Sequence, residues 1–167
     1  LAAITDPEAK MQRRALAALA NFSPPSPQTV ARLTEMLSAP VPKNRDEASR
    51  QEKKTALVAR ALGSINGLAD YSAVEAALVA AVRERTLKKG GLLNRIRKTM
   101  EEVDEPWVAM AAVDSLAKVG GKTALDCLAA IGDDQGELSS KAREAEAKIK
   151  ARMDQTLTGR RTSLPNP

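Results

Sequence analysis

The chain has 167 residues, enough for one domain with a sizeable core, and its 26 basic and 21 acidic side chains give a formal net charge of +5. The absence of histidine and the single cysteine, Cys127, exclude serine triads, histidine-containing zinc sites and disulfides within the chain. Aromatic residues make up only 2% of the chain, and the apolar residues are mainly alanine, leucine and valine, which favours closely packed helices over strands.

Residues 5–40 are predicted to form a first helical hairpin. Asp6 and Pro7 are typical of a helix start, because aspartate caps the first amides and proline suits the first helical position. The proline-rich residues 23–27 end this helix, and Pro40 helps to end the next one. Apolar residues recur at helical spacing in both helices: Met11, Ala15, Ala18, Leu19 and Phe22 in the first, and Val30, Leu33, Met36 and Leu37 in the second.

Residues 47–85 are predicted to form a second hairpin. The charged residues 43–54 predict a loop that leads into a solvated helical turn. The helix that follows has Gly63 and Gly67 near its end, and Gly67 is the better C-cap candidate. Its apolar stripe carries Thr55, Val58, Ala59, Leu62 and Ile65, and the partner helix, which begins near Asp70 or Ser72, carries Val74, Leu78 and Val82.

Residues 104–132 are predicted to form a third hairpin. Asp104 and Pro106 repeat the acid-then-proline start of the first hairpin, and Gly120-Gly121 marks the turn between its helices. The apolar stripes carry Val108, Ala112, Val113, Leu116 and Val119 on the first helix, and Leu125, Leu128 and Ile131 on the second.

Residues 137–155 are predicted to form a capping helix. Its apolar residues are sparse, as suits a terminal repeat that has a neighbour on one side only and faces water on the other. The polar residues 158–167, which include two prolines, are expected to form a flexible tail. The narrow stripe of the capping helix consists of Leu138, Ala142, Ala145, Ile149 and Met153.

A short pattern recurs on the first helix of each predicted hairpin: a small residue, a second small residue, leucine, and an apolar residue three places on. Recurrence at this scale is typical of stacked helical repeats. We therefore predict an all-α fold, an α-solenoid of about three antiparallel hairpins plus the capping helix, in one domain over residues 1–157. The copies read Ala15-x-x-Ala18-Leu19-x-x-Phe22, Val58-x-x-Ala61-Leu62-x-x-Ile65 and Ala112-x-x-Ser115-Leu116-x-x-Val119.

These residues resemble HEAT repeats of the divergent bacterial kind, also called HEAT-like or phycobilisome-lyase-like repeats, over about residues 5–132. The chain departs from that pattern in the uneven spacing of its repeats and in lacking the arginine usual early in the first helix. The resemblance implies a scaffold that binds other proteins. It rests on Asp6-Pro7, Ala18-Leu19, Ala61-Leu62-Gly63 and Ser115-Leu116, and the positions of the missing arginine hold Gln12, Thr55 and Ala109.

The uneven spacing comes from an inserted basic segment, residues 83–103. One interpretation is a basic lobe that contacts phosphates or an acidic partner, with salt-dependent binding. The interpretation we favour is a long connection whose amphipathic helix docks on the stack, with the nearby acids pairing locally. Trp107 is a further candidate because aromatic residues anchor interfaces, although coverage of a core edge is favoured. The candidate partner-binding residues are Arg83, Arg85, Lys88, Lys89, Arg95, Arg97, Lys98 and Trp107.

From these features we expect a non-catalytic scaffold that contacts another protein through the surfaces of its second helices. The alternative is a module that binds the backbone of duplex DNA through residues 83–98, although the scarcity of aromatic residues disfavours base flipping. A lyase or glycosylase activity follows only from analogy with the family. No catalytic, cofactor or metal residues are predicted, and the oligomeric state stays open. The second-helix surfaces lie around Arg32, Glu35, Glu75 and Arg83.

No apolar run approaches the roughly 20 residues that span a bilayer, and no signal-peptide pattern is visible. We therefore expect the chain in the cytoplasm. Because it begins at Leu1 rather than methionine, an extracytoplasmic location after removal of an N-terminal signal stays open. Cys127 lies among apolar residues of a predicted core helix, and we expect it to be a buried small hydrophobe.

Overall fold

The computed structural model describes residues 26–42, 44–87, 107–132 and 136–161, together with residues 14 and 18. No strand occurs within these residues, and the predicted all-α class is confirmed for them. The helices of the described ranges are α2 (Pro27–Leu37), α3 (Arg45–Leu62), α4 (Ser72–Leu87), α6 (Trp107–Val119), α7 (Lys122–Gly132) and α8 (Glu137–Arg161).

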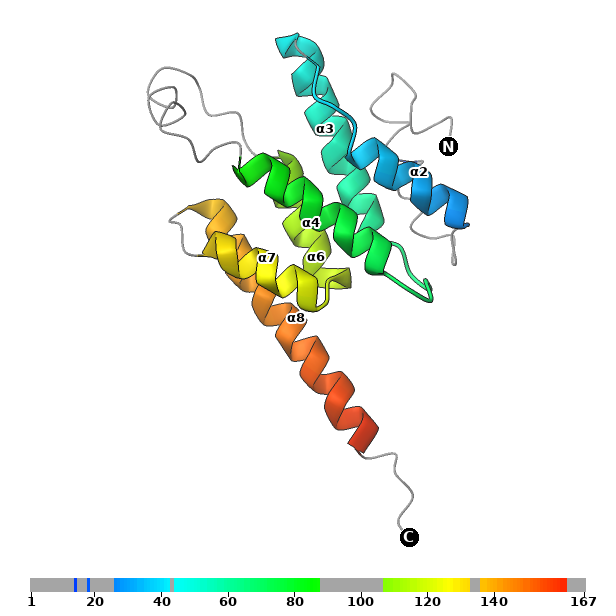
Figure 1. The fold of residues 1–167 in the computed structure, drawn as a ribbon, viewed down its shortest axis with the longest axis vertical. Coiled ribbons are helices and arrows are strands. Elements are labelled where there is room, and N and C mark those ends of the chain that lie inside the picture. The colour runs from blue at the N-terminus through cyan, green and yellow to red at the C-terminus, as the bar shows by residue number, and fades with distance from the viewer. Residues whose placement is uncertain are drawn as a thin grey trace.

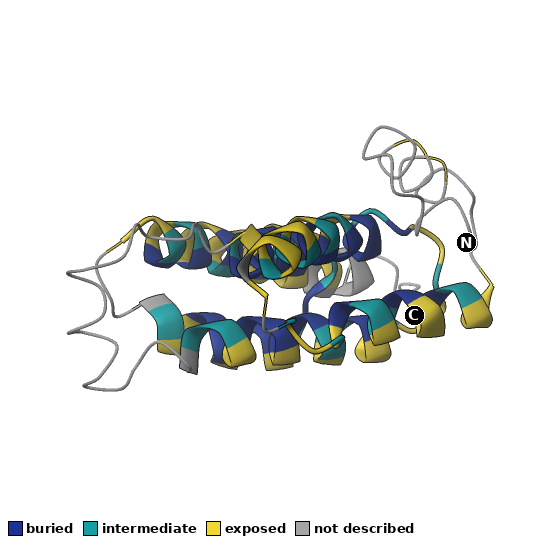
Figure 2. Cartoon of the chain, turned by 90° about the horizontal axis from the view of Figure 1, so that it is seen from above, coloured by how far each residue is buried: buried dark blue, intermediate teal, exposed yellow. Residues whose placement is uncertain are grey.

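These helices pack in two layers (Figure 1, Figure 2). In one layer α4 packs against both α2 and α7, and in the other α6 packs against both α3 and α8. We call the first the second-helix layer, because its helices are the second helices of the predicted hairpins. Between the layers, α2 packs on α3, α4 on α6 and α7 on α8. Each helix of the second-helix layer therefore contacts the next described helix along the chain.

The core lies between the two layers, where Figure 2 shows the buried residues. Every described helix contributes one leucine or isoleucine side chain with no exposed surface, and burial of each such side chain stabilises the fold by roughly 1.5–3 kcal/mol. All of them belong to the apolar stripes predicted from helical spacing, so the periodicity of the sequence locates the core correctly. These residues are Leu33, Leu62, Leu78, Leu116, Leu128 and Ile149.

Helix α3 begins earlier than predicted. The segment 43–54 was expected to be a loop leading into a helical turn, but the chain is helical from Arg45. Asn44 caps the helix, since its side-chain oxygen accepts hydrogen bonds from the N–H groups of Asp46 at 2.9 Å and Glu47 at 3.4 Å. The two acidic side chains also face the positive end of the helix dipole, and this favours helix where charge density alone suggested a loop.

The end of α3 also differs from the prediction, because the C-cap is Gly63 and not Gly67. Gly63 keeps right-handed backbone angles, with φ −73° and ψ −9°. Gly67 has φ 78°, in the left-handed region that glycine adopts readily, and lies in the loop beyond the helix. The left-handed glycine therefore shapes the loop between α3 and α4 and does not end the helix.

Helix α4 begins at Ser72, as predicted, and hydrogen bonds fix the residues just before it. The Asp70 carboxylate accepts hydrogen bonds from the Ser72 N–H at 2.8 Å and the Ser72 hydroxyl at 2.7 Å, which hold the pKa of Asp70 below its ordinary value. The Tyr71 hydroxyl donates to the Ile65 carbonyl at 3.1 Å. Tyr71 thus closes the α3–α4 loop as well as marking a helix start.

Helix α8 is longer than the predicted cap and continues to Arg161. Residues 158–161, expected in the flexible tail, are therefore its last turn. Ile149 is fully buried, whereas Met153 at the end of the predicted stripe is 39% exposed. The reason is visible in Figure 1, where the C-terminal part of α8 extends past the other helices and nothing in the described ranges covers it.

Two further predictions fall largely outside the described residues. In the first predicted helix only residues 14 and 18 are described, and both are helical and exposed. Ala18, expected on the buried stripe, is therefore not covered by the described helices. The inserted basic segment was predicted to begin at residue 83, but residues 83–87 are the last part of α4 and residues 88–106 lie outside the described ranges.

Candidate functional site

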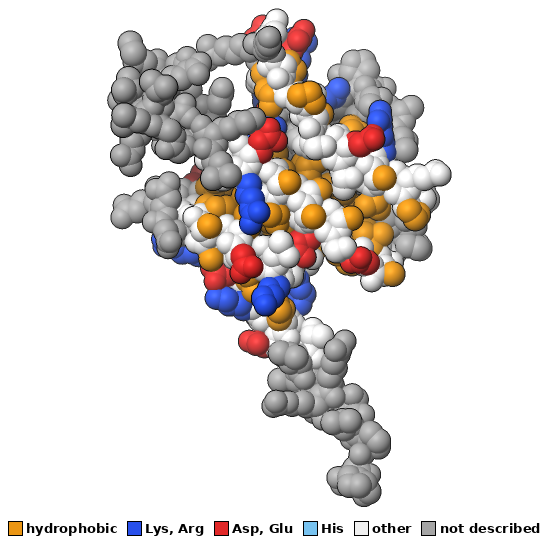
Figure 3. Space-filling model, in the orientation of Figure 1, with side chains coloured by type: hydrophobic (Ala, Val, Ile, Leu, Met, Phe, Trp, Pro, Cys, Tyr) orange, Lys and Arg blue, Asp and Glu red, His pale blue; other side chains and the backbone are white. Residues whose placement is uncertain are grey.

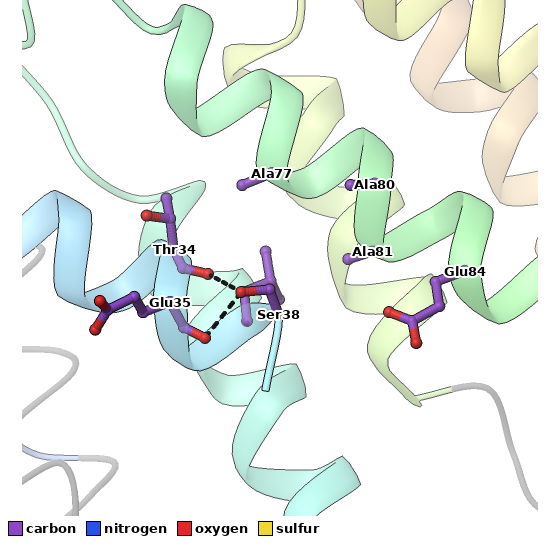
Figure 4. A pocket seen from close by; sticks show the side chains of 8 residues that line it. Thr34, Glu35, Ser38, Ala77, Ala80, Ala81 and Glu84 are labelled. Atoms are coloured by element: carbon purple, nitrogen blue, oxygen red, sulfur yellow. Dashed lines mark hydrogen bonds between the residues drawn. The ribbon is translucent and has the colours of Figure 1, made fainter. Parts of the chain in front are cut away.

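A groove separates α2 from α4 on the outer side of the second-helix layer (Figure 4). Its volume is about 290 Å³, at the lower limit of small-molecule sites, and suits an inserted side chain better than a whole ligand. Alanines of α4 form one wall, and the C-terminal end of α2 forms the other. The lining residues are Thr34, Glu35, Leu37, Ser38, Ala77, Ala80, Ala81 and Glu84.

The hydroxyl groups of the groove are already used by α2. The Thr34 hydroxyl donates to the Ala31 carbonyl at 2.8 Å. The Ser38 hydroxyl lies 3.2 Å from the Thr34 carbonyl oxygen and 3.0 Å from that of Glu35 (Figure 4). With these protons engaged locally, the groove offers an incoming group apolar contact and hydrogen-bond acceptors.

The charged side chains that line the groove are both acidic. The Glu84 side chain, 43% exposed, extends from α4 toward α2 and pairs with Arg85 at 3.6 Å. Glu35 extends to the far side of α2 and pairs with Arg32 at 2.6 Å (Figure 4). No basic side chain lines the groove, and the last turn of α2 contains none either. The carbonyl groups at the C-terminal end of α2 add partial negative charge. The charged side chains in the lining are therefore acidic, and each of the two carboxylates is paired with an arginine of its own helix.

The outer face of α4 beside the groove is made of small apolar residues. Ala73, Ala76 and Ala80 are exposed, and Ala77 is half-buried. Figure 3 shows hydrophobic side chains gathered over the middle of this face of the molecule. Alanines at these positions leave the helix backbone accessible to a partner at short range, so the face is suited to close packing.

The turn between α6 and α7 is held by residues from two other helices. The Glu75 carboxylate of α4 accepts a hydrogen bond from the Ala124 N–H at 2.7 Å, in the first turn of α7. Arg152 of α8 donates to the carbonyls of Ala117 at 3.0 Å, Lys118 and Gly120, at the C-terminal end of α6. Glu75 thus faces the positive N-terminal end of α7, and Arg152 faces the negative C-terminal end of α6. Glu75, predicted on the contact surface, is used within the fold.

We expect Glu75→Ala to lower the free energy of unfolding by about 1–2 kcal/mol, because the Ala124 N–H loses its partner at a half-buried helix start. Urea denaturation followed by circular dichroism measures the change. Glu35→Ala is the control, since its exposed pair with Arg32 should contribute no more than roughly 1 kcal/mol. Equal losses in the two variants would show that the Glu75 contact does not stabilise the turn.

Arg152→Met should also lower the free energy of unfolding by about 1–2 kcal/mol, because methionine keeps much of the aliphatic stem and removes only the hydrogen bonds to the end of α6. Lys150→Met on the same helix is the matched control, since Lys150 pairs only with Glu146 at the surface. Thermal melts of both variants at neutral pH make the comparison, and a Lys150 variant as unstable as the Arg152 variant would contradict the role of Arg152.

The structure describes three of the eight candidate partner-binding residues. Arg85 is mostly buried, with 13% of its side chain exposed, and its Nε lies 3.3 Å from a Glu52 carboxylate oxygen of α3. Arg83 is exposed on α4. Trp107, the first residue of α6, is 42% exposed. The other candidates, Lys88, Lys89, Arg95, Arg97 and Lys98, lie outside the described residues.

Cys127 is buried in α7, with 3% of its surface exposed, as predicted. Burial raises the pKa of its thiol, and the nearby Arg83 opposes this shift without overcoming it. At pH 8 the folded protein should therefore react only slowly with Ellman's reagent, because the thiolate fraction is low and access is blocked. Rapid reaction in urea is the control, and labelling of the folded chain at that rate would contradict the burial.

Sequence reasoning predicted a contact surface on the second helices, and it missed the groove and the residues that hold the α6–α7 turn. A signal for the groove was present in the alanines of α4, which recur on outward as well as inward positions. No comparable signal exists for Glu75 and Arg152, because their partners are backbone groups far away in sequence.

Within the described ranges, no three histidine, cysteine, aspartate or glutamate side chains gather as they would around a metal ion. None of the described helices is long and apolar enough to cross a membrane. Comparisons with protein-family models, with curated proteins and with solved structures find no match to this chain. The resemblance to HEAT repeats therefore rests on the repeated residues alone.

Proposed function

We propose that this chain is a non-catalytic protein-interaction module, built as a stack of HEAT-like helical hairpins, whose docking surface is the outer face of the second-helix layer. The observation that carries the proposal is the groove between α2 and α4 together with the alanine face beside it. A pocket that accepts a side chain, set in an apolar surface, is the usual form of an anchor site for another protein.

The placement of the basic candidates favours a protein partner over duplex DNA. Arg85 pairs with both Glu52 and Glu84 and is largely covered, so it offers little charge to a phosphate. The groove itself has no basic side chain in its lining that could contact a phosphate. The described part of α4 therefore supports the scaffold function that the helical repeats imply.

The docking surface can be tested with peptides that are selected from a random library displayed on phage. Each selected peptide is then synthesised, and its affinity is measured by fluorescence anisotropy for the wild type and two variants. Ala76→Arg places a long side chain on the outer face of α4, and Ala147→Arg places the same side chain on the exposed surface of α8. The two variants have the same net charge, so they differ in location only.

We expect peptides that bind the wild type and Ala147→Arg alike, and bind Ala76→Arg about tenfold or more weakly, as for an obstructed interface centre. Peptides whose affinity is unchanged by both substitutions would contradict the proposed surface. Micromolar binding of a DNA duplex that falls steeply between about 50 and 200 mM salt would instead favour the nucleic-acid function.

A further inference from the structure

We infer that the exposed side of α3 binds an acidic segment of a partner protein. Helix α3 belongs to the layer that also contains α6 and α8 (Figure 1). This surface is therefore distinct from the docking surface proposed above, and the two proposals can fail separately. Four basic side chains define it, and we call them the basic face of α3: Arg50, Lys53, Lys54 and Arg60.

The four cations lie together on the side of α3 that faces away from the core. At about 100° per residue they fall within an arc of about 120°, and from Arg50 to Arg60 they extend over about 15 Å. Three of them are exposed, and Lys54 is half-buried. Ala59 has no exposed surface and lies on the opposite side of the helix. The basic face is thus a continuous strip that a partner can reach.

The cations of this strip lack partners of their own. In the part of the chain that the structure describes, none of the four side chains forms an ion pair. Lys53, Lys54 and Arg60 also have no acidic residue three or four positions away, where a local partner on the helix would have to lie. Glu52 lies between these positions in the sequence but on another side of α3, and its carboxylate pairs with Arg85 of α4.

The arrangement of charges on α3 differs from that on an ordinary solvated helix. On α8, Lys148 and Lys150 each pair with a glutamate one turn earlier. On α3, Arg50 has like charges three and four positions later, at Lys53 and Lys54, and such neighbours destabilise a helix. A bound carboxylate would relieve this repulsion and form charge-assisted hydrogen bonds with the cations.

The pattern along the face favours an acidic peptide over a phosphate backbone. Asp46 and Glu47 are exposed in the first turn of α3, and they would repel a phosphate backbone that continued past the cations. Half-buried Leu57 lies one turn from both Lys53 and Arg60 and offers an apolar contact that phosphates do not use. A peptide can match both features, with acidic residues opposite the cations and an apolar residue beside Leu57.

The random peptide library supplies the test. Peptides are selected on the immobilised wild type and eluted with about 0.5 M sodium chloride, which releases binders held by charge. Their affinities are measured by fluorescence anisotropy at about 50 and 200 mM salt, together with that of a DNA duplex. Lys53→Gln with Arg60→Gln removes two cations of the basic face. Lys148→Gln with Lys150→Gln is the matched control, because it removes the same charge from exposed positions of α8. Circular dichroism checks that both variants fold.

We expect acidic peptides with an apolar residue, which bind the wild type and the α8 variant alike and bind the α3 variant about fivefold or more weakly at low salt. The difference should shrink at the higher salt concentration. Equal losses in the two variants would mean that net charge alone attracts the peptides, and the inference would be wrong. Selected peptides without acidic residues would also overturn it.

Two further results would assign the surface or the peptides differently. A DNA duplex that binds more tightly than the peptides, and loses affinity for the α3 variant, would overturn the choice of a protein partner. Acidic peptides that lose affinity for Ala76→Arg instead would bind the docking surface on α4, so the basic face would be wrong while that surface stands. Failure of the docking surface would leave the effect of the α3 substitutions unchanged.

Discussion

Replacement of Leu62 by aspartate is expected to unfold the domain. Leu62 has no exposed surface and lies in the last turn of α3, where that helix packs against α2 and α6. The substitution removes a leucine side chain from the core, which costs roughly 2–5 kcal/mol, and leaves an unpaired charge in its place. Because domains of this size are stable by only about 5–15 kcal/mol, the combined cost removes most of the stability.

Circular dichroism at 222 nm against temperature measures the effect, and Arg60→Asp is the control. Arg60 is exposed and lies two residues earlier in the same turn, so that variant places the same carboxylate near the negative end of α3 without burying it. Its cost should be about 1 kcal/mol or less, apart from the loss of the arginine itself. A Leu62 variant that melts as the wild type does would show that the stacking described for α3 is incorrect.

The apolar stripes could be predicted from the sequence because a helix buries every third or fourth residue. Leu33, Leu78 and Ile149 are buried for this reason alone, and no knowledge of their neighbours is needed to place them. The same rule fails at Met153, which has the correct spacing but lies beyond the helices that would cover it. Periodicity predicts which face of a helix is buried. How many turns of that face are covered depends on the lengths of the neighbouring helices.

The contacts that hold the helices in place could not be predicted in this way. The Ser115 hydroxyl donates to the Ala59 carbonyl at 2.8 Å, and Glu75 accepts from the Ala124 N–H, each between residues on different helices. Helical spacing carries no information on which two helices cross or where. The groove is likewise a property of the gap between α2 and α4. Neither the alanines of α4 nor the residues at the end of α2 that line it reveal it when each helix is considered alone.

Gly63→Ala is expected to destabilise the domain by about 1–3 kcal/mol through overpacking. A methyl group at Gly63 would lie 2.6 Å from the Cα of Ser115, so the close crossing of α3 and α6 must open. The backbone of Gly63 is right-handed, with φ −73°, and alanine is intrinsically favoured over glycine in that conformation. Any loss of stability measured in urea therefore comes from packing against α6 and not from the backbone.

Gly136→Ala supplies the control, because a methyl group there meets no atom within 4 Å and the residue has no positive φ. Gly136 lies at the start of α8, where alanine is a poorer cap than glycine. Alanine also restricts the unfolded chain, which opposes that loss. The net change in the free energy of unfolding should therefore be within about 1 kcal/mol. Adding Ser115→Gly to Gly63→Ala should recover only part of the loss, since the Cα of Ser115 stays in place. Full recovery would mean that the side chain of Ser115, and not the backbone of α6, sets the distance between the two helices.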